Sequence, residues 1–254
     1  MPAPTNRFKA ALAAQDRPLI GLWMAMTSPF AAEILGECGY DWLVIDGEHA
    51  PNTLPTIMGQ LQALAASAAA PVVRVPIGEP WVIKQVLDVG AQTILVPMVD
   101  SAEQAAALVR AVRYPPQGMR GVGASFARAG RFGTIPDYVV TANDQIALIV
   151  QVETAAGIAA IDAIAATEGV DGVFIGPSDL AADMGHPGQP GAADVQTAIE
   201  HGLARIRAAG KAAGILATDE APARRYIGWG ATFVAVGGDV GIFRAAAQTL
   251  RARF

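Results

Sequence analysis

Short apolar runs rich in Val, Ile and Leu recur along the chain, and stretches with helical periodicity separate them. The runs are almost continuously hydrophobic rather than alternating, which is typical of strands covered on both faces in a parallel sheet. The candidate strands are residues 19–25, 42–46, 71–76, 93–99, 146–153, 172–175, 214–217 and 232–236. The candidate helices are residues 29–38, 54–66, 81–89, 102–112, 155–166, 194–209 and 220–228, with a final helix over 240–253.

Eight strands, each followed by a helix, within 254 residues predict a (β/α)8 TIM barrel. Glycines just past the expected helix ends, at Gly39, Gly90, Gly210 and Gly230, support these boundaries. The main rival is a doubly wound open sheet, but no G-x-G-x-x-G turn follows the first strand. No low-complexity linker divides the chain, so we expect a single barrel domain over residues 1–254.

The composition is 52% apolar, and no run approaches the roughly 20 residues of a membrane-spanning helix. The first ten residues lack the apolar segment of a signal peptide. With a net charge of −5 and no basic run, a nucleic-acid surface is not expected. The single cysteine, Cys38, excludes an intrachain disulfide, so the composition predicts a cytoplasmic protein without membrane or nucleic-acid partners.

Glu153 is the last residue of the expected strand 146–153, and Asp179 follows the neighbouring expected strand 172–175. Carboxylates at the carboxyl ends of adjacent barrel strands can hold a hard divalent cation, with water and substrate oxygens completing its coordination. The alternative is that each carboxylate caps the helix that follows it. Zinc is disfavoured, because the three histidines lie far apart in the sequence.

His49 and Arg74 also fall near strand ends. A histidine just beyond a strand is suited to general-base work near neutral pH, although such a residue also serves in turns. Arg74 interrupts the apolar strand Val-Val-Arg-Val-Pro at 72–76, where an unpaired charge would be costly. Its partner is either a structural carboxylate or the developing oxyanion of a substrate, and the residues alone leave both open.

The chain contains only three lysines, Lys9, Lys84 and Lys211, and none falls on an expected strand. A Schiff-base aldolase requires a lysine that points into the barrel. Carbanion chemistry in this chain would therefore need a metal ion and an arginine.

Two connections are long, residues 113–143 after the fourth strand and 178–194 after the sixth. We expect both to lie at the carboxyl ends of the strands, where barrels build their sites. Arg120, Ser125 and Arg128 in the first connection are candidates to bind the aldehyde half of a substrate. The alternative for Arg120 is an ion pair with an acid of the same connection.

Several motifs together resemble the HpcH/HpaI aldolases, the class II (metal-dependent) pyruvate aldolases. The most specific are Asp-Gly-Glu-His-Ala at 46–50 and Gly-Pro-Ser-Asp-Leu at 176–180. Further matching segments are 6–9, 21–23, 32–35, 41–52, 73–76, 113–121 and 151–154. The resemblance thus extends over almost the entire chain and implies the same barrel.

The resemblance also implies a role for individual residues. It assigns the metal ligands to Glu153 and Asp179, the general base to His49 and the enolate-stabilising group to Arg74. It assigns substrate contacts to Gln151 and Ser178. From their places after the expected strands and in the first long connection, we also expect Trp23, Asp179 and Arg120 to contact the substrate. Asp88 corresponds to an aspartate that raises the basicity of the histidine across a subunit contact. The family implies a homo-hexamer, a trimer of dimers, with the last helix exchanged between partners.

The implied activity is the reversible cleavage of 4-hydroxy-2-oxo acids to pyruvate or hydroxypyruvate and an aldehyde, through a metal-stabilised enolate. Mg²⁺ or Mn²⁺ is the expected cofactor, with Co²⁺ as a third option, and no organic cofactor is expected. One alternative is an oxaloacetate decarboxylase or another enolising 2-oxo-acid lyase on the same site. A second alternative is a non-catalytic barrel that binds an organic acid.

Overall fold

Eight parallel strands form a closed barrel in the order β1 to β8, in the computed structural model that describes all 254 residues. The strands are β1 (Leu19–Met24), β2 (Trp42–Asp46), β3 (Ala70–Arg74), β4 (Thr93–Val96), β5 (Ala147–Val152), β6 (Gly172–Ile175), β7 (Ala212–Leu216) and β8 (Phe233–Gly238). Each of the eight predicted strands is present; β2 and β6 have the predicted ends, and one or both ends of the other six differ by one to three residues. The (β/α)8 prediction is therefore confirmed.

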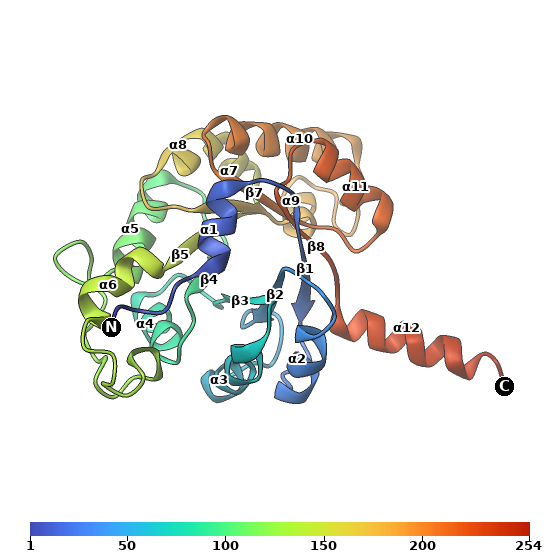
Figure 1. Ribbon diagram of the computed structural model, residues 1–254. Coiled ribbons are helices and arrows are strands. Elements are labelled where there is room, and N and C mark those ends of the chain that lie inside the picture. Colours follow the sequence, from blue (N-terminus) through green and yellow to red (C-terminus); the bar gives the residue numbers. More distant parts are fainter.

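Helices cover the outside of the barrel, and the main apolar core lies between them and the strands (Figure 1). They are α2 (Pro29–Gly36), α3 (Leu54–Ala63), α4 (Pro80–Asp88), α5 (Ala102–Val112), α7 (Ala155–Ala159), α8 (Ile161–Ala166), α10 (Ala193–Ala208) and α11 (Glu220–Gly228). The four glycines predicted to end helices, Gly39, Gly90, Gly210 and Gly230, have positive φ angles between 75° and 108°. They supply the left-handed backbone that helix ends favour.

Aromatic rings fill the inside of the barrel. Trp42, Phe174 and Phe233 pack against one another with ring centroids 5.5–6.4 Å apart. Space for them comes from Gly214, where an added Cβ would lie 2.2 Å from the Phe233 ring. Phe8 closes this layer from α1 (Arg7–Ala14), which lies across the amino-terminal end of the strands (Figure 1). The inside of the barrel is therefore filled with side chains at this end, and barrels of this kind build their catalytic sites at the carboxyl ends of the strands.

Three helices were not predicted from the sequence. They are α1, α6 (Tyr138–Gln145) and α9 (Pro177–Asp183). Their apolar periodicity is weak because each has only seven or eight residues and packs in a loop region. The helix predicted over 155–166 is divided at Ala160 into α7 and α8.

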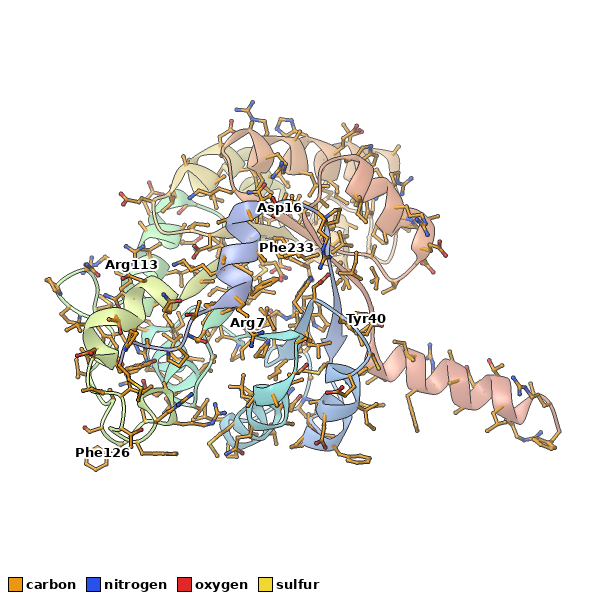
Figure 2. All side chains as sticks on the ribbon, in the orientation of Figure 1. Arg7, Asp16, Tyr40, Arg113, Phe126 and Phe233 are labelled. Carbon is orange, nitrogen blue, oxygen red and sulfur yellow. The ribbon has the colours of Figure 1, made fainter.

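The last helix, α12 (Asp239–Arg251), projects away from the barrel (Figure 1). Every residue of α12 after Val240 is exposed, including the large apolar side chains of Ile242, Phe243 and Leu250. Figure 2 shows that most of α12 stands clear of the rest of the chain. None of the helices meets the length and hydropathy requirements for crossing a bilayer.

Candidate active site

A cavity of about 140 Å³ opens at the carboxyl ends of the strands, which we call the mouth. It is lined by six of the residues predicted to form the site: Trp23, His49, Arg74, Gln151, Ser178 and Asp179. They come from five different strands and the turns that follow them. The closed barrel therefore brings together residues that are up to 156 positions apart in the sequence, between 23 and 179.

Arg74 is buried between two carboxylates at the edge of the mouth. The register of β2 on β3 places Asp46 directly opposite Arg74. Nε and Nη2 of Arg74 donate to the two carboxylate oxygens of Asp46 at 2.9 and 2.7 Å. Nη1 lies 2.7 Å from Oε2 of Glu48. Arg74 thus has structural partners, and it also faces the cavity. The two alternatives that the sequence left open are therefore compatible.

The same aspartate organises the turn that carries His49. Oδ1 of Asp46 accepts the backbone N–H groups of Glu48 and His49 at 2.9 and 3.3 Å. Its Oδ2 accepts the indole N–H of Trp23 at 3.2 Å. Arg74 lies 4.9 Å from the centre of the Trp23 ring, within the range of a cation–π contact. Burial opposes ionisation of Asp46, but the bonds and charge of Arg74 keep its pKa below the usual value.

His49 is the most accessible of these groups. Its side chain is 66% exposed, and Nε2 lies 3.9 Å from the Glu48 carboxylate. Burial raises the pKa of Glu48, although the Arg74 charge opposes this shift. The imidazole is therefore open to substrate and solvent and has a single carboxylate neighbour.

Glu153 is almost completely buried immediately behind the cavity. One carboxylate oxygen accepts the backbone N–H of Met98 at 2.8 Å, and the other accepts the side-chain amide of Gln151. Burial raises the pKa of Glu153. Capping does not explain this residue, because Thr154 is the residue that caps α7. The helix-cap alternative for Glu153 is therefore wrong.

Asp179 and Ser178 belong to the first turn of α9 and line the mouth. Neither Asp179 nor Glu153 forms an ion pair with a basic side chain. The nearby Gly176 leaves the Glu153 carboxylate free of side-chain crowding, since a Cβ there would lie 2.4 Å from Oε2.

These residues fit a divalent cation. A buried carboxylate without a basic partner is costly unless a cation compensates its charge, and oxygen ligands suit Mg²⁺ or Mn²⁺. No group of three or more His, Cys, Asp or Glu side chains is arranged around a common point. The protein would therefore supply two ligands, and water or substrate oxygens would supply the others.

Arg120 and Asp88 lie at the opposite end of the barrel. The prediction that residues 113–143 open onto the mouth is wrong, because α5 first returns the chain to the amino-terminal end of the strands. Arg120 is fully buried, stacks 4.4 Å from the centre of the Tyr114 ring, and donates to Asp88 at 2.7 Å. Arg120 is therefore in an ion pair, but its partner is the last residue of α4 and not an acid of residues 113–143. Neither residue reaches the mouth of its own barrel.

The sequence predicts no role for Asp46 or Glu48, although both belong to the Asp-Gly-Glu-His-Ala motif at 46–50. The structure shows that they hold Arg74 and the His49 turn. Their signal in the sequence is the single charged residue on the next strand, which requires a buried partner. Identifying that partner requires knowing which residues of β2 and β3 lie side by side. The composition does not give this register.

Comparison with known proteins places this geometry in context. A family model described as HpcH/HpaI aldolase/citrate lyase matches residues 19–246. A hydroxypyruvate/pyruvate aldolase of Roseovarius nubinhibens is 63% identical over 251 residues, covering 98% of this chain and 97% of that protein. A 5-keto-4-deoxy-D-glucarate aldolase of Salmonella arizonae is 57% identical over 249 residues, covering 98% and 96%. The crystal structure of an HpcH/HpaI aldolase/citrate lyase family protein from Burkholderia cenocepacia superposes with a TM-score of 0.94 at 47% identity, covering 98% and 99%.

Removing the buried carboxylate partner of Arg74 should destabilise the fold. In Asp46→Asn, Arg74 retains only Glu48, and we expect a loss of about 3 kcal/mol in the free energy of unfolding. The matched control is Asp162→Asn, because Asp162 binds Arg205 through the same two nitrogens, but on the surface. Chemical denaturation should show no measurable change for this control. Equal effects of the two substitutions would contradict the role given to Asp46.

Proposed function

The chain belongs to the HpcH/HpaI aldolase/citrate lyase family, and from this membership we propose that it reversibly cleaves 4-hydroxy-2-oxo acids into pyruvate or hydroxypyruvate and an aldehyde. The observation that carries the proposal is the mouth, where Arg74, His49 and Asp179 surround one cavity. The buried carboxylate of Glu153, which has no basic partner, lies directly behind it. The names of the relatives support aldol chemistry with a 2-oxo acid as the nucleophilic partner.

Glu153 and Asp179 would hold the divalent cation, which we propose is Mg²⁺ or Mn²⁺. When bound, such a cation supplies positive charge that polarises the 2-oxo group of the substrate. Glu153 is positioned for this before any ligand arrives, because the Met98 N–H and the Gln151 amide fix its carboxylate. Gln151 and Ser178 line the same cavity and would contact the carboxylate end of the 2-oxo acid.

Arg74 would stabilise the negative charge that develops on the 2-oxo oxygen as the C3–C4 bond breaks. A fixed donor aimed at a developing oxyanion contributes about 3–4 kcal/mol, or about 10²- to 10³-fold in rate. The guanidinium needs no reorganisation for this, because Asp46, Glu48 and the Trp23 ring already fix its plane.

His49 would act as the general base. In cleavage it takes the proton of the C4 hydroxyl group, either directly or through a water molecule. In the reverse direction it removes a proton from the methyl carbon of the 2-oxo acid. Its exposed ring and the Asp46-bound turn beneath it suit a group that must reach the substrate from the open side of the mouth.

The family resemblance supports an oligomer. The exposed apolar side chains of α12 are suited to packing against a partner subunit, and we propose that this helix is exchanged within a dimer and that three dimers form a hexamer. Asp88 of one subunit would then face His49 of another. The single cysteine is compatible with a reducing compartment, and we propose the cytoplasm.

Decarboxylation of oxaloacetate is the alternative reaction for the same mouth, because it also develops charge on a 2-oxo oxygen. The relatives favour cleavage of a carbon–carbon bond to an aldehyde instead. Faster release of CO2 from oxaloacetate than of pyruvate from a 4-hydroxy-2-oxo acid would favour the alternative.

Removal of the metal or of Arg74 should abolish most of the activity. After treatment with a chelator, pyruvate release from a 4-hydroxy-2-oxo acid should fall to background and return with Mg²⁺ or Mn²⁺. Arg74→Ala should lower kcat/KM about 10²- to 10³-fold. Arg205→Ala, which removes a surface arginine with the same type of aspartate contact, should leave kcat/KM unchanged. Full activity in both the chelated enzyme and Arg74→Ala would exclude this mechanism.

Mixing two inactive variants tests whether Asp88 acts across a subunit contact. His49→Gln and Asp88→Asn should each be nearly inactive alone, because each lacks one member of the intersubunit pair. After subunit exchange, mixed oligomers contain some mouths with both native residues, and activity should reappear. If mixing restores no activity although native mass spectrometry shows mixed oligomers, Asp88 acts only within its own chain, through Arg120.

A further inference from the structure

A second cavity, of about 660 Å³, opens at the amino-terminal end of the barrel, opposite the mouth. Its walls are the starts of β3 and β4, the end of α3, the segment before α1, and the turn around residues 128–132. This volume lies within the range of small-molecule sites, about 300–1,000 Å³. The proposed aldolase activity uses none of the residues that line this cavity.

The charges around this cavity all have one sign. Arg7, Arg128 and Arg131 line it, and no Asp, Glu, His or Lys does. None of the three arginines takes part in an ion pair anywhere in the chain. Figure 2 shows Arg7 beside α1, at the front of the barrel. Three uncompensated cations around one hollow, in a chain of net charge −5, produce a local positive potential that attracts anions.

Arg128 is held rigidly at the cavity wall. Its Nη1 donates to the backbone carbonyl of Val89 at 3.0 Å, and its Nη2 lies 3.5 Å from the carbonyl of Leu61. Gly90 makes room for the guanidinium, since a Cβ there would lie 2.2 Å from Nη1. Burial lowers the pKa of Arg128, and no carboxylate opposes that shift.

A structural role accounts for Arg128 only in part. The two carbonyls belong to the last turns of α3 and α4, so Arg128 stabilises both helix ends. The side chains of Arg7 and Arg131 are exposed and donate no hydrogen bond to the protein, so packing does not explain why they border the same hollow. Leu61, Phe132 and other apolar side chains form about half of the lining. The site therefore suits a charged group carried on an apolar body.

We propose that this cavity binds a small organic oxyanion, a phosphate ester or a polycarboxylate with an apolar portion. Arginine guanidinium groups match both oxyanions through paired N–H donors. The site is separate from the mouth and does not depend on the proposed aldolase activity.

Isothermal titration of the full-length protein tests the proposal. The probes are phenyl phosphate and phthalate, which both carry two charges on an aromatic ring, and benzyl alcohol is the uncharged comparison. We expect saturable binding of at least one dianion at constant ionic strength, and none of benzyl alcohol. Tighter binding of phenyl phosphate indicates a phosphate ester as the ligand, and tighter binding of phthalate indicates a polycarboxylate.

The variants locate the binding. The double variant Arg7→Gln/Arg131→Gln should bind the dianion about 10- to 100-fold more weakly. This is the range expected for losing hydrogen bonds from charged groups, about 10- to 100-fold in affinity. The matched control, Arg110→Gln/Arg207→Gln, also removes two exposed arginines without ion pairs, and it should bind as the native protein does. Both arginines of the test variant are exposed, so its thermal unfolding should be unchanged. If the double variant does not fold, each single variant should show a partial loss.

Two results would overturn the proposal. One is the absence of saturable binding of either dianion to the native protein in the millimolar range. The other is equal affinity of the test and control variants, which would place any bound dianion elsewhere, including at Arg74 in the mouth.

Discussion

The buried contact of Arg74 with Asp46 is the interaction on which the candidate site depends. It joins neighbouring strands at the mouth, and the same aspartate binds the Trp23 indole and the backbone of the His49 turn. A buried guanidinium without a partner would be too costly to maintain, so the site requires the carboxylate before it can present the arginine. Because the barrel is closed, β2 and β3 cannot slip relative to each other without disturbing every other strand pair.

The part of the mouth formed by the ends of β5 and β6 carries charge of the opposite kind. Glu153 is buried without a basic partner, and burial raises its pKa. Arg74 has two carboxylates, whereas Glu153 and Asp179 have no cation in the protein. This asymmetry leaves one wall that can stabilise negative charge on a substrate and another that needs an added cation. A 2-oxo acid, with its carboxylate and keto oxygens, is suited to lie between them.

The barrel could be predicted from the sequence because strands covered on both faces leave continuous apolar runs such as Val-Val-Arg-Val. The mouth could be predicted because the carboxyl ends of all eight strands meet, which places Glu153 and Asp179 near His49. The pairing of Arg74 with Asp46 could not be predicted, since it depends on the register between β2 and β3. The predicted place of Arg120 is wrong because α5, which the sequence predicts over 102–112, carries the chain away from the mouth before residue 113. Short helices such as α9 lack enough turns to show a period.

The central claim is that Glu153 and Asp179 hold one divalent cation that a 2-oxo acid shares. Equilibrium titration of Mn²⁺, followed by the paramagnetic resonance of the free ion, tests it with and without pyruvate. We predict one Mn²⁺ per chain, tighter binding with pyruvate, and loss of binding in Glu153→Gln, whereas exposed Glu103→Gln binds normally. Coupling between two ligands is reciprocal, so pyruvate should also bind more tightly with Mn²⁺. Mn²⁺ affinity that changes neither with pyruvate nor in Glu153→Gln would contradict the claim.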